Sequence, residues 1–160
     1  SITYSTQIVK LAASLGIEIP ILGGDTLDSN MVLEAAAGSD VQLYVSTFYQ
    51  EGGSPEFDEG FKAWLSEDST AMTNNGGNDT IAAVTAMGYD AYYVALEALK
   101  AAGSTDKAAV KAALPDVTYT GVSGSIAFDE QGDAIRDTAY IKTADTANNA
   151  WTLETVQTVE

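Results

Sequence analysis

Two helix–strand units follow one another at the start of the chain, and this order constrains the fold more than any other feature. In each unit, apolar residues at helical spacing are followed by a short run of apolar, β-forming residues. Gly16 and Gly38 stand where the two helices would end in the left-handed conformation. The expected helices cover 4–15 and 31–37, and the expected strands cover 19–22 and 41–48. This alternation predicts an α/β fold.

The middle of the chain is predicted to be helical. The triplet 54–56 is a favourable helix start, because proline is tolerated at the first position and an acidic residue suits the positive end of the helix dipole. After a loop over 73–79, a long helix is expected from about 80 to 102, ended by Gly103. Gly88, inside that helix, predicts a kink or a close backbone approach. The predicted buried stripe of the helix that starts at 54–56 consists of Phe57, Phe61, Trp64 and Leu65.

The last third of the chain changes to a β pattern. Ser104 or Thr105 is expected to cap a short helix that Pro115 ends. Beyond Pro115, stretches rich in β-forming residues alternate with polar turns, which is typical of hairpins. The expected strands cover 125–128, 138–143 and 151–156.

The charge and composition exclude several functions. The chain has 7 Lys plus Arg against 23 Asp plus Glu, a formal net charge of -16, and neither His nor Cys. Disulfides, Cys/His zinc sites, thiol nucleophiles and Ser-His-Asp triads are therefore impossible. Such an acidic chain is unsuited to nucleic acid or to an anionic membrane surface, because both require positive charge.

The remaining chemical motifs favour structural roles. The acidic turn 129–133 lacks the spaced ligands and the terminal glutamate of an EF-hand, so a hairpin turn around Gly132 is expected instead of a metal site. Tyr89, Tyr92 and Tyr93 are expected to pack against a sheet instead of forming a sugar-binding platform. No residue is singled out as a second acid to partner Asp25, so we expect neither catalysis nor a cofactor.

Four stretches of the chain, in this order, carry a family resemblance: 7–17, 20–25 (PILGGD), 88–104 (opening GYDA and closing EALKAAGS) and 121–133 (GVSGSIAFDEQGD). Together they resemble the branched-chain amino acid receptors of ATP-binding-cassette transporters, which have the type I periplasmic-binding-protein fold. Members of that family are longer and have two Rossmann-like lobes. The resemblance therefore implies that this chain is the C-terminal portion of such a protein and that an N-terminal portion is missing.

The same resemblance implies how the chain divides between the lobes. Residues 1–48 and the hairpins of 138–160 would belong to the second lobe, and 49–137 would be the returning part of the first lobe. Because half of each sheet would be absent, we expect the chain to expose apolar surface that the missing portion covers.

The resemblance also implies three ligand-binding residues. Asp25 follows a strand and a Gly-Gly pair, and in the family an acidic residue at this place holds the α-ammonium of the bound amino acid. The alternative is that Asp25 turns the chain or caps the next helix. Ser1 falls at a family cleft position, although it is equally a chain end. Val84, or its neighbour Ala83, falls where a first-lobe side chain contacts the ligand, although a valine in a helix stripe is more often core.

The function that the resemblance implies is an extracytoplasmic solute-binding receptor, either periplasmic or a cell-surface lipoprotein. Its lobes would close around a branched-chain or other aliphatic amino acid, or a related small polar solute, and a membrane permease would recognise the closed form. The alternatives are a ligand-sensing ectodomain of a signalling receptor and, less favoured, a carboxylate-based hydrolase.

Overall fold

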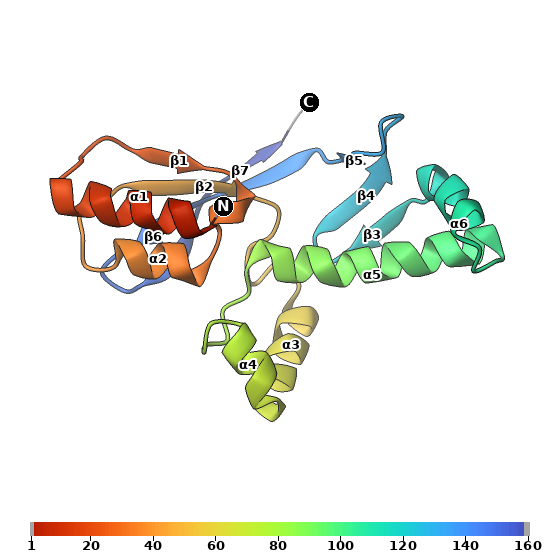
Figure 1. Ribbon diagram of the computed structural model, residues 1–160, viewed down its shortest axis with the longest axis horizontal. Coiled ribbons are helices and arrows are strands. Elements are labelled where there is room, and N and C mark those ends of the chain that lie inside the picture. The colour runs from red at the N-terminus through yellow and green to blue at the C-terminus, as the bar shows by residue number, and fades with distance from the viewer. Residues whose placement is uncertain (1, 159–160) are drawn as a thin grey trace.

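A four-stranded mixed sheet and a small antiparallel sheet lie at opposite ends of the molecule in the computed structural model, which describes residues 2–158 (Figure 1). The larger sheet has the order β1-β2-β6-β7. Its strands are β1 (Ile21–Gly23), β2 (Leu43–Thr47), β6 (Thr138–Asp145) and β7 (Ala150–Thr158). β1 and β2 are parallel and the other two pairings are antiparallel. Val45 is opposite Lys142, so strands from both ends of the chain form one sheet.

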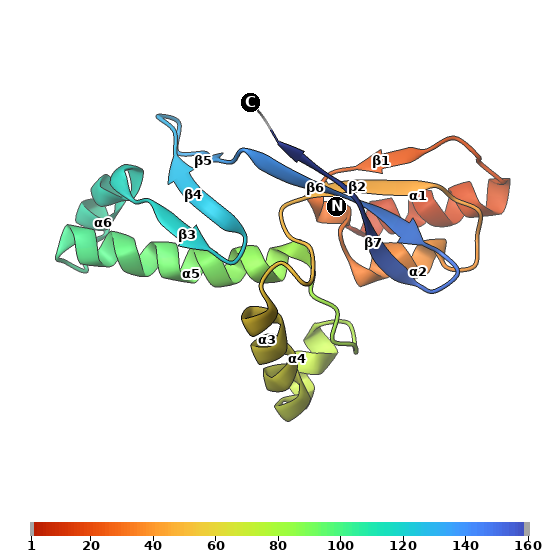
Figure 2. The same cartoon turned by 180° about the vertical axis from the view of Figure 1, so that it is seen from behind.

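Two helices cover one face of the larger sheet. α1 (Ile2–Leu15) and α2 (Asn30–Ala36) pack on it through a core that includes Val9, Val32 and Leu43, all buried. Gly16 (φ 63°) and Gly38 (φ 69°) adopt the left-handed conformation, which confirms both predicted stops. Seen from behind, the opposite face of the sheet carries no helix from the described residues (Figure 2).

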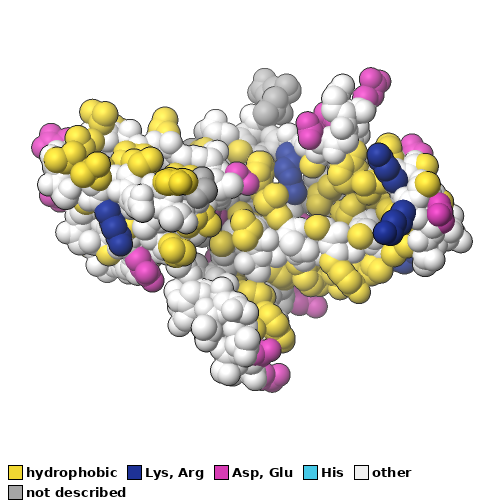
Figure 3. Space-filling view, viewed as in Figure 1, with side chains coloured by type: hydrophobic (Ala, Val, Ile, Leu, Met, Phe, Trp, Pro, Cys, Tyr) yellow, Lys and Arg dark blue, Asp and Glu magenta, His cyan; other side chains and the backbone are white. Residues whose placement is uncertain are grey.

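The first helix has apolar side chains on two sides. Val9 and Ala12 face the sheet and are buried. Ile8, Leu11 and Leu15 form a second stripe that is 60%, 58% and 65% exposed, and we call it the α1 stripe. Figure 3 shows apolar side chains gathered over this end of the molecule. The helical periodicity of the sequence therefore predicts the helix correctly, although most of its apolar surface is uncovered in residues 2–158.

The smaller sheet packs against the longest helix. α5 (Ala83–Ala102) ends at Gly103 (φ 58°), as predicted. The strands are β3 (Tyr119–Gly121), β4 (Gly124–Phe128) and β5 (Ala134–Ile135), in that spatial order, and they follow α6 (Lys107–Ala113) and a 3₁₀ turn, η2 (Leu114–Asp116). Val94 and Ala98 of α5 pack on Val117 and Ile126 to form the core of this end.

A buried carboxylate ties α5 to the turn between β3 and β4. Asp90 is fully buried, and its Oδ1 accepts a hydrogen bond from the Val122 amide at 2.9 Å. Its Oδ2 accepts from the amide and the hydroxyl of Ser123 at 2.8 and 2.5 Å. Gly121 is required beside it, because a Cβ there would lie 2.2 Å from Asp90 Oδ1. These contacts fix the turn against the middle of the helix.

A pair of helices projects between the two ends of the molecule. α3 (Pro55–Glu67) begins at the predicted proline. Its predicted stripe is only partly buried: Leu65 is buried, Phe57 and Phe61 are half-buried, and Trp64 is 52% exposed. α4 (Ser69–Asn74) was not predicted, because this polar segment has no helical apolar period. Asp68 caps it by accepting hydrogen bonds from the amides of Thr70 and Ala71.

The expected cap of the short helix was wrong. Asp106, instead of Ser104 or Thr105, caps α6, because its carboxylate accepts from the Ala109 amide at 3.0 Å while the Ser104 hydroxyl accepts from the Asp106 amide. Of the two alternatives predicted at Gly88, the close backbone approach is absent within the described residues, since a Cβ there would meet no atom within 4 Å. No helix among residues 2–158 has both the length and the apolar character needed to span a bilayer.

We predict that Asp90→Ala lowers the free energy of unfolding by at least about 2 kcal/mol, because it leaves three donors at the β3–β4 turn without their charged acceptor. Urea denaturation of the variant and the parent protein measures this difference. The control is Glu97→Ala on the same helix, whose exposed ion pair with Lys100 should contribute less than about 1 kcal/mol. Equal losses in the two variants would contradict the role given to Asp90.

Candidate functional site

The strongest candidate site lies at the carboxyl end of β1. The strand ends at Gly23, and the chain passes through Gly24 into a 3₁₀ turn, η1 (Asp25–Leu27). A Cβ at Gly24 would meet no atom within 4 Å, so the backbone is open to an approaching molecule. The Asp25 side chain is half-buried, and no hydrogen bond or ion pair within residues 2–158 engages its carboxylate. Ser29, instead of Asp25, caps α2.

A second carboxylate, three residues after Asp25, is deeply buried and heavily bonded. Asp28 Oδ2 accepts hydrogen bonds from the Thr47 hydroxyl at 2.9 Å and the Ala83 amide at 3.2 Å. It also forms an ion pair with the Lys142 ammonium at 3.0 Å. Asp28 and Lys142 are each 2% exposed. This carboxylate therefore joins the turn after β1 to β2, to β6 and to the first residue of α5.

The first turn of α5 lies close to the segment that carries Asp25. A hydrogen bond from the Ala83 amide to Asp28 holds the two segments together. Asn30 strengthens this contact, since its amide nitrogen donates to Asn78 Oδ1 at 2.8 Å in the loop that enters α5. Val84 comes directly after Ala83 in the chain, and it is 58% exposed. It is therefore not part of the core of the described residues.

The chain passes twice between the two ends of the molecule, and the two passages touch. Phe48 follows β2, and Arg136 precedes β6. The Arg136 guanidinium lies over the Phe48 ring at 5.1 Å from its centroid, which is a cation–π contact. Arg136 also donates to the Ser123 carbonyl at 2.9 Å and to its hydroxyl at 3.2 Å. The passages are thereby fixed to each other and to the Asp90 network.

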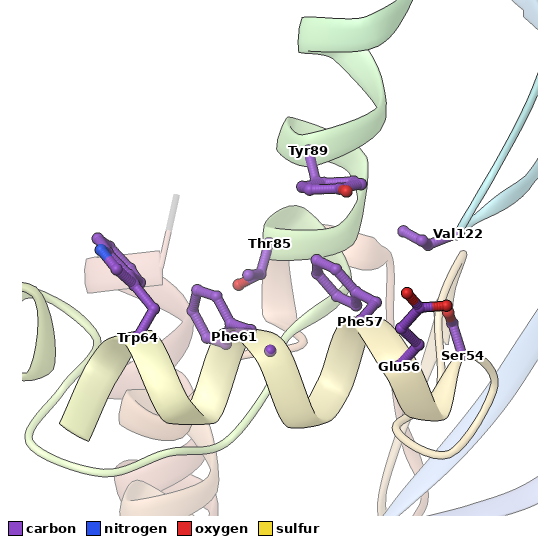
Figure 4. A pocket seen from close by; sticks show the side chains of 9 residues that line it. Ser54, Glu56, Phe57, Phe61, Trp64, Thr85, Tyr89 and Val122 are labelled. Carbon is purple, nitrogen blue, oxygen red and sulfur yellow. The ribbon is translucent and has the colours of Figure 1, made fainter. Parts of the chain in front are cut away.

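A different cavity, an open apolar groove of about 670 Å³, lies between α3 and α5. Phe57, Phe61 and Trp64 of α3 point toward Thr85 and Tyr89 of α5 (Figure 4). The Phe57 and Tyr89 rings are 5.0 Å apart. Aromatic surface dominates this groove, and Glu56 is its one charged lining residue. The groove is therefore suited to packing against apolar side chains of another segment.

The tyrosines of α5 differ in their surroundings. Tyr93 stacks on Tyr119 of β3, with ring centroids 6.0 Å apart, as expected for packing against a sheet. Tyr89 lines the groove, and a hydrogen bond from its hydroxyl to that of Tyr93 raises the pKa of Tyr89 to about 12. Tyr92 is 63% exposed. The expectation that all three pack on the sheet was therefore correct only for Tyr93.

A buried tyrosine anchors the start of α3 below the groove. The Tyr49 hydroxyl donates to Asp58 Oδ1 at 2.6 Å and accepts from the Ser54 amide at 3.1 Å. Burial, together with the neighbouring carboxylate, raises the pKa of Tyr49 well above its usual range. This phenol therefore stays neutral and holds α3 in place at physiological pH.

In the acidic turn between β4 and β5, the Asp129 carboxylate accepts hydrogen bonds from backbone amides of the turn itself. Asp129 Oδ1 accepts from the amides of Gln131 and Asp133, at 2.9 and 2.8 Å, and Gly132 has a φ of 90°. No group of three or more acidic side chains within residues 2–158 is arranged to hold a metal ion.

The structure places two of the three predicted ligand-binding residues on segments that adjoin. Asp25 and Val84 lie on adjoining segments held together through Asp28 and Ala83. Ser1 lies outside the described residues. Sequence reasoning missed Asp28 and Lys142 as partners, because 114 residues separate them in the chain. The one available signal was the position of Asp28 next to a predicted helix start.

Comparison with known proteins identifies the family. The family model described as "Periplasmic binding protein" matches residues 3–149. A leucine-binding protein, LivK, of Thermotoga maritima aligns with a TM-score of 0.73 and 28% identity over 98% of this chain. A substrate-binding protein of an ABC transporter from Desulfitobacterium hafniense, in complex with Leu, aligns with a TM-score of 0.62 and 26% identity over 96% of this chain.

The fold is also shared with more distant structures. The branched-chain amino acid transporter substrate-binding protein LivJ of Streptococcus pneumoniae, in complex with isoleucine, has a TM-score of 0.66 and 22% identity over 98% of this chain. The search of curated proteins finds no match. The chain spans 42% of the length of LivK and 41% of the length of the other two structures.

We predict a measurable coupling between the two chain passages. Phe48→Leu and Arg136→Lys should each lower the free energy of unfolding, because lysine keeps the charge but loses the stacked, forked contact of arginine. A double-mutant cycle measured by urea denaturation should give a coupling energy of about 0.5–1 kcal/mol. Strict additivity of the two single losses would show that the passages are energetically independent.

Proposed function

The chain belongs to the periplasmic-binding-protein family, and we propose that it forms part of an extracytoplasmic solute-binding receptor of an ATP-binding-cassette transporter. LivK, a leucine-binding protein, and the Leu-bound transporter protein of Desulfitobacterium hafniense support this proposal, since both align over nearly the whole chain. The task of such a receptor is binding without a chemical step. Its partners are a small solute and a membrane permease.

The ligand we propose is an aliphatic amino acid, with Asp25 as the residue that binds its ammonium group. The observation that carries this assignment is the Asp25 carboxylate itself, half-buried at the carboxyl end of β1 and without a protein partner in residues 2–158. Ligands of open α/β sheets collect at the carboxyl ends of strands. A charge-assisted hydrogen bond there contributes about 1.5–3 kcal/mol. We further propose that Val84 contacts the apolar part of the ligand.

We propose that residues 1–48 and 138–160 belong to one lobe and residues 49–137 to the other. The arrangement of the two sheets at opposite ends of the molecule supports this division (Figure 1). The passages at Phe48 and Arg136 would then act as the hinge, and closure of the lobes would enclose the solute.

We also propose that the remainder of the two-lobed fold covers the apolar surface left open here. The chain spans 42% of LivK, and the α1 stripe and the aromatic groove are both uncovered in residues 2–158. Contiguous apolar surface of this kind marks a site of contact with other protein. Binding tests therefore use the complete gene product that carries this chain.

Asp25→Ala in the complete gene product should weaken leucine binding by about 10- to 100-fold, as expected from the loss of one charge-assisted hydrogen bond. Isothermal titration calorimetry measures the affinity. A second ligand, 4-methylpentanoate, is leucine without its ammonium group, so its affinity should be the same in parent and variant.

The matched control is Asp40→Ala, which removes the same charge from an exposed position of the same lobe. It should leave both affinities unchanged. A parent protein that binds leucine and 4-methylpentanoate equally well would refute the assignment of Asp25.

Leu11→Asp should lower the free energy of unfolding of the complete gene product by at least about 2 kcal/mol, because it would bury an unpaired charge beneath the covering part of the lobe. The control is Ser14→Asp, which adds the same charge on the exposed polar side of α1. Thermal and urea denaturation compare the two variants. A Leu11 variant as stable as the Ser14 variant would mean that the α1 stripe is solvent-exposed in the complete protein.

A further inference from the structure

The Asp28 carboxylate joins segments that are remote in the chain. Its partners Thr47, Ala83 and Lys142 are 19, 55 and 114 residues away. All three bonds end on Oδ2, and Oδ1 has no partner among the described residues. One side-chain atom therefore links the turn after β1 with two strands of the larger sheet and with the helix of the smaller sheet.

The bond to Ala83 supplies a helix cap that the local sequence lacks. The residue before α5 is Ala82, which has no side-chain acceptor. Its carbonyl accepts from the Thr85 amide at 3.0 Å, but no local side chain caps the Ala83 amide. Asp28 accepts from the Ala83 amide and also places a negative charge at the positive end of this 20-residue helix. The position of α5 therefore depends on a residue of the other sheet's layer.

The same residue fixes the segment that carries Asp25. The Asp28 amide donates to the Asp25 carbonyl at 3.0 Å, which closes the η1 turn. Asn30, two residues on, holds Asn78 in the loop before α5. The Asp25 turn is thus held against the entry of α5 at two points.

Stability alone is a poor explanation for this ion pair. Both Asp28 and Lys142 are 2% exposed, and the cost of removing two charges from water commonly offsets their attraction. What such a pair does provide is a defined geometry, because the charge must be met by donors at fixed positions.

We propose that Asp28 is a positioning residue that holds the Asp25 turn against the first turn of α5, so that Asp25 and Val84 face one ligand. This inference rests on the proposed function, since it concerns the same binding site. Asp28 acts through Asp25 and α5 and does not itself touch the solute.

Two double variants of the complete gene product test the proposal. Asp28→Asn with Lys142→Met removes both buried charges but keeps a side-chain oxygen that accepts from Ala83 and Thr47. Asp28→Ala with Lys142→Met removes the same charges and the acceptor as well. The two variants therefore differ in the hydrogen bonds to Ala83 and Thr47, and both lack the ion pair.

The first readout is the ratio of leucine affinity to 4-methylpentanoate affinity, measured by calorimetry. A general loss of stability lowers the affinity for both ligands alike, whereas misplacement of Asp25 lowers the affinity for leucine only. We expect this affinity ratio in the asparagine variant to stay within about 3-fold of the ratio in the parent protein. In the alanine variant the ratio should fall by about 10-fold, which corresponds to the free energy of one helix cap.

The second readout needs no ligand. Hydrogen exchange of the Ala83 amide should be about 10-fold faster in the alanine variant than in the asparagine variant, because only the latter keeps an acceptor for it. Exchange near the carboxyl end of α5 should be equal in the two.

The outcomes separate the two proposals. If the parent protein binds leucine and 4-methylpentanoate with equal affinity, Asp25 does not bind the ammonium group, and the positioning role of Asp28 is refuted as well. A parent ratio well above one that both double variants retain equally refutes the positioning role alone. Equal exchange of Ala83 in the two variants also refutes it, because Asp28 would then not cap α5.

Discussion

The Asp28 carboxylate is the contact on which the arrangement of the two sheets most depends. It accepts hydrogen bonds from Thr47 at the end of β2 and from Ala83 at the start of α5, and it pairs with Lys142 of β6. A charge buried to this extent tolerates little displacement, since any partner that moves away leaves it uncompensated. This contact lies next to the passage of the chain between the sheets. It also constrains the turn that carries Asp25, which is directly beside it.

A second set of contacts joins the two passages to each other. Arg136 stacks on Phe48 and donates to Ser123, whose amide and hydroxyl are in turn bound by the buried Asp90 of α5. Both joints therefore end on α5, one at its first residue and one near its middle. This 20-residue helix is therefore held at two points by residues outside it. In the two-lobed receptor that we propose, it would carry its part of the cleft as a rigid element.

Much of the fold was predictable, because local patterns set most elements. Apolar periodicity and glycine stops located α1, α2, β2 and α5. The prediction that Asp25 follows a strand is confirmed by its place after β1, whereas its binding of a ligand stays a prediction. α4 (Ser69–Asn74) was missed because capping, instead of an apolar stripe, starts it. Asp28 and Arg136 were missed as joints for a different reason. Their partners are distant in sequence, and no local pattern distinguishes a buried carboxylate from the many exposed ones in so acidic a chain.

We propose that Asp25 anchors an amino acid in a cleft between two lobes. A crystal structure of the complete gene product grown with leucine tests this assignment most directly. We expect the ligand ammonium at about 3 Å from the Asp25 carboxylate, with Val84 against the aliphatic side chain. A ligand seated elsewhere, for example in the groove between Phe57 and Tyr89, with Asp25 turned to solvent, would contradict the assignment.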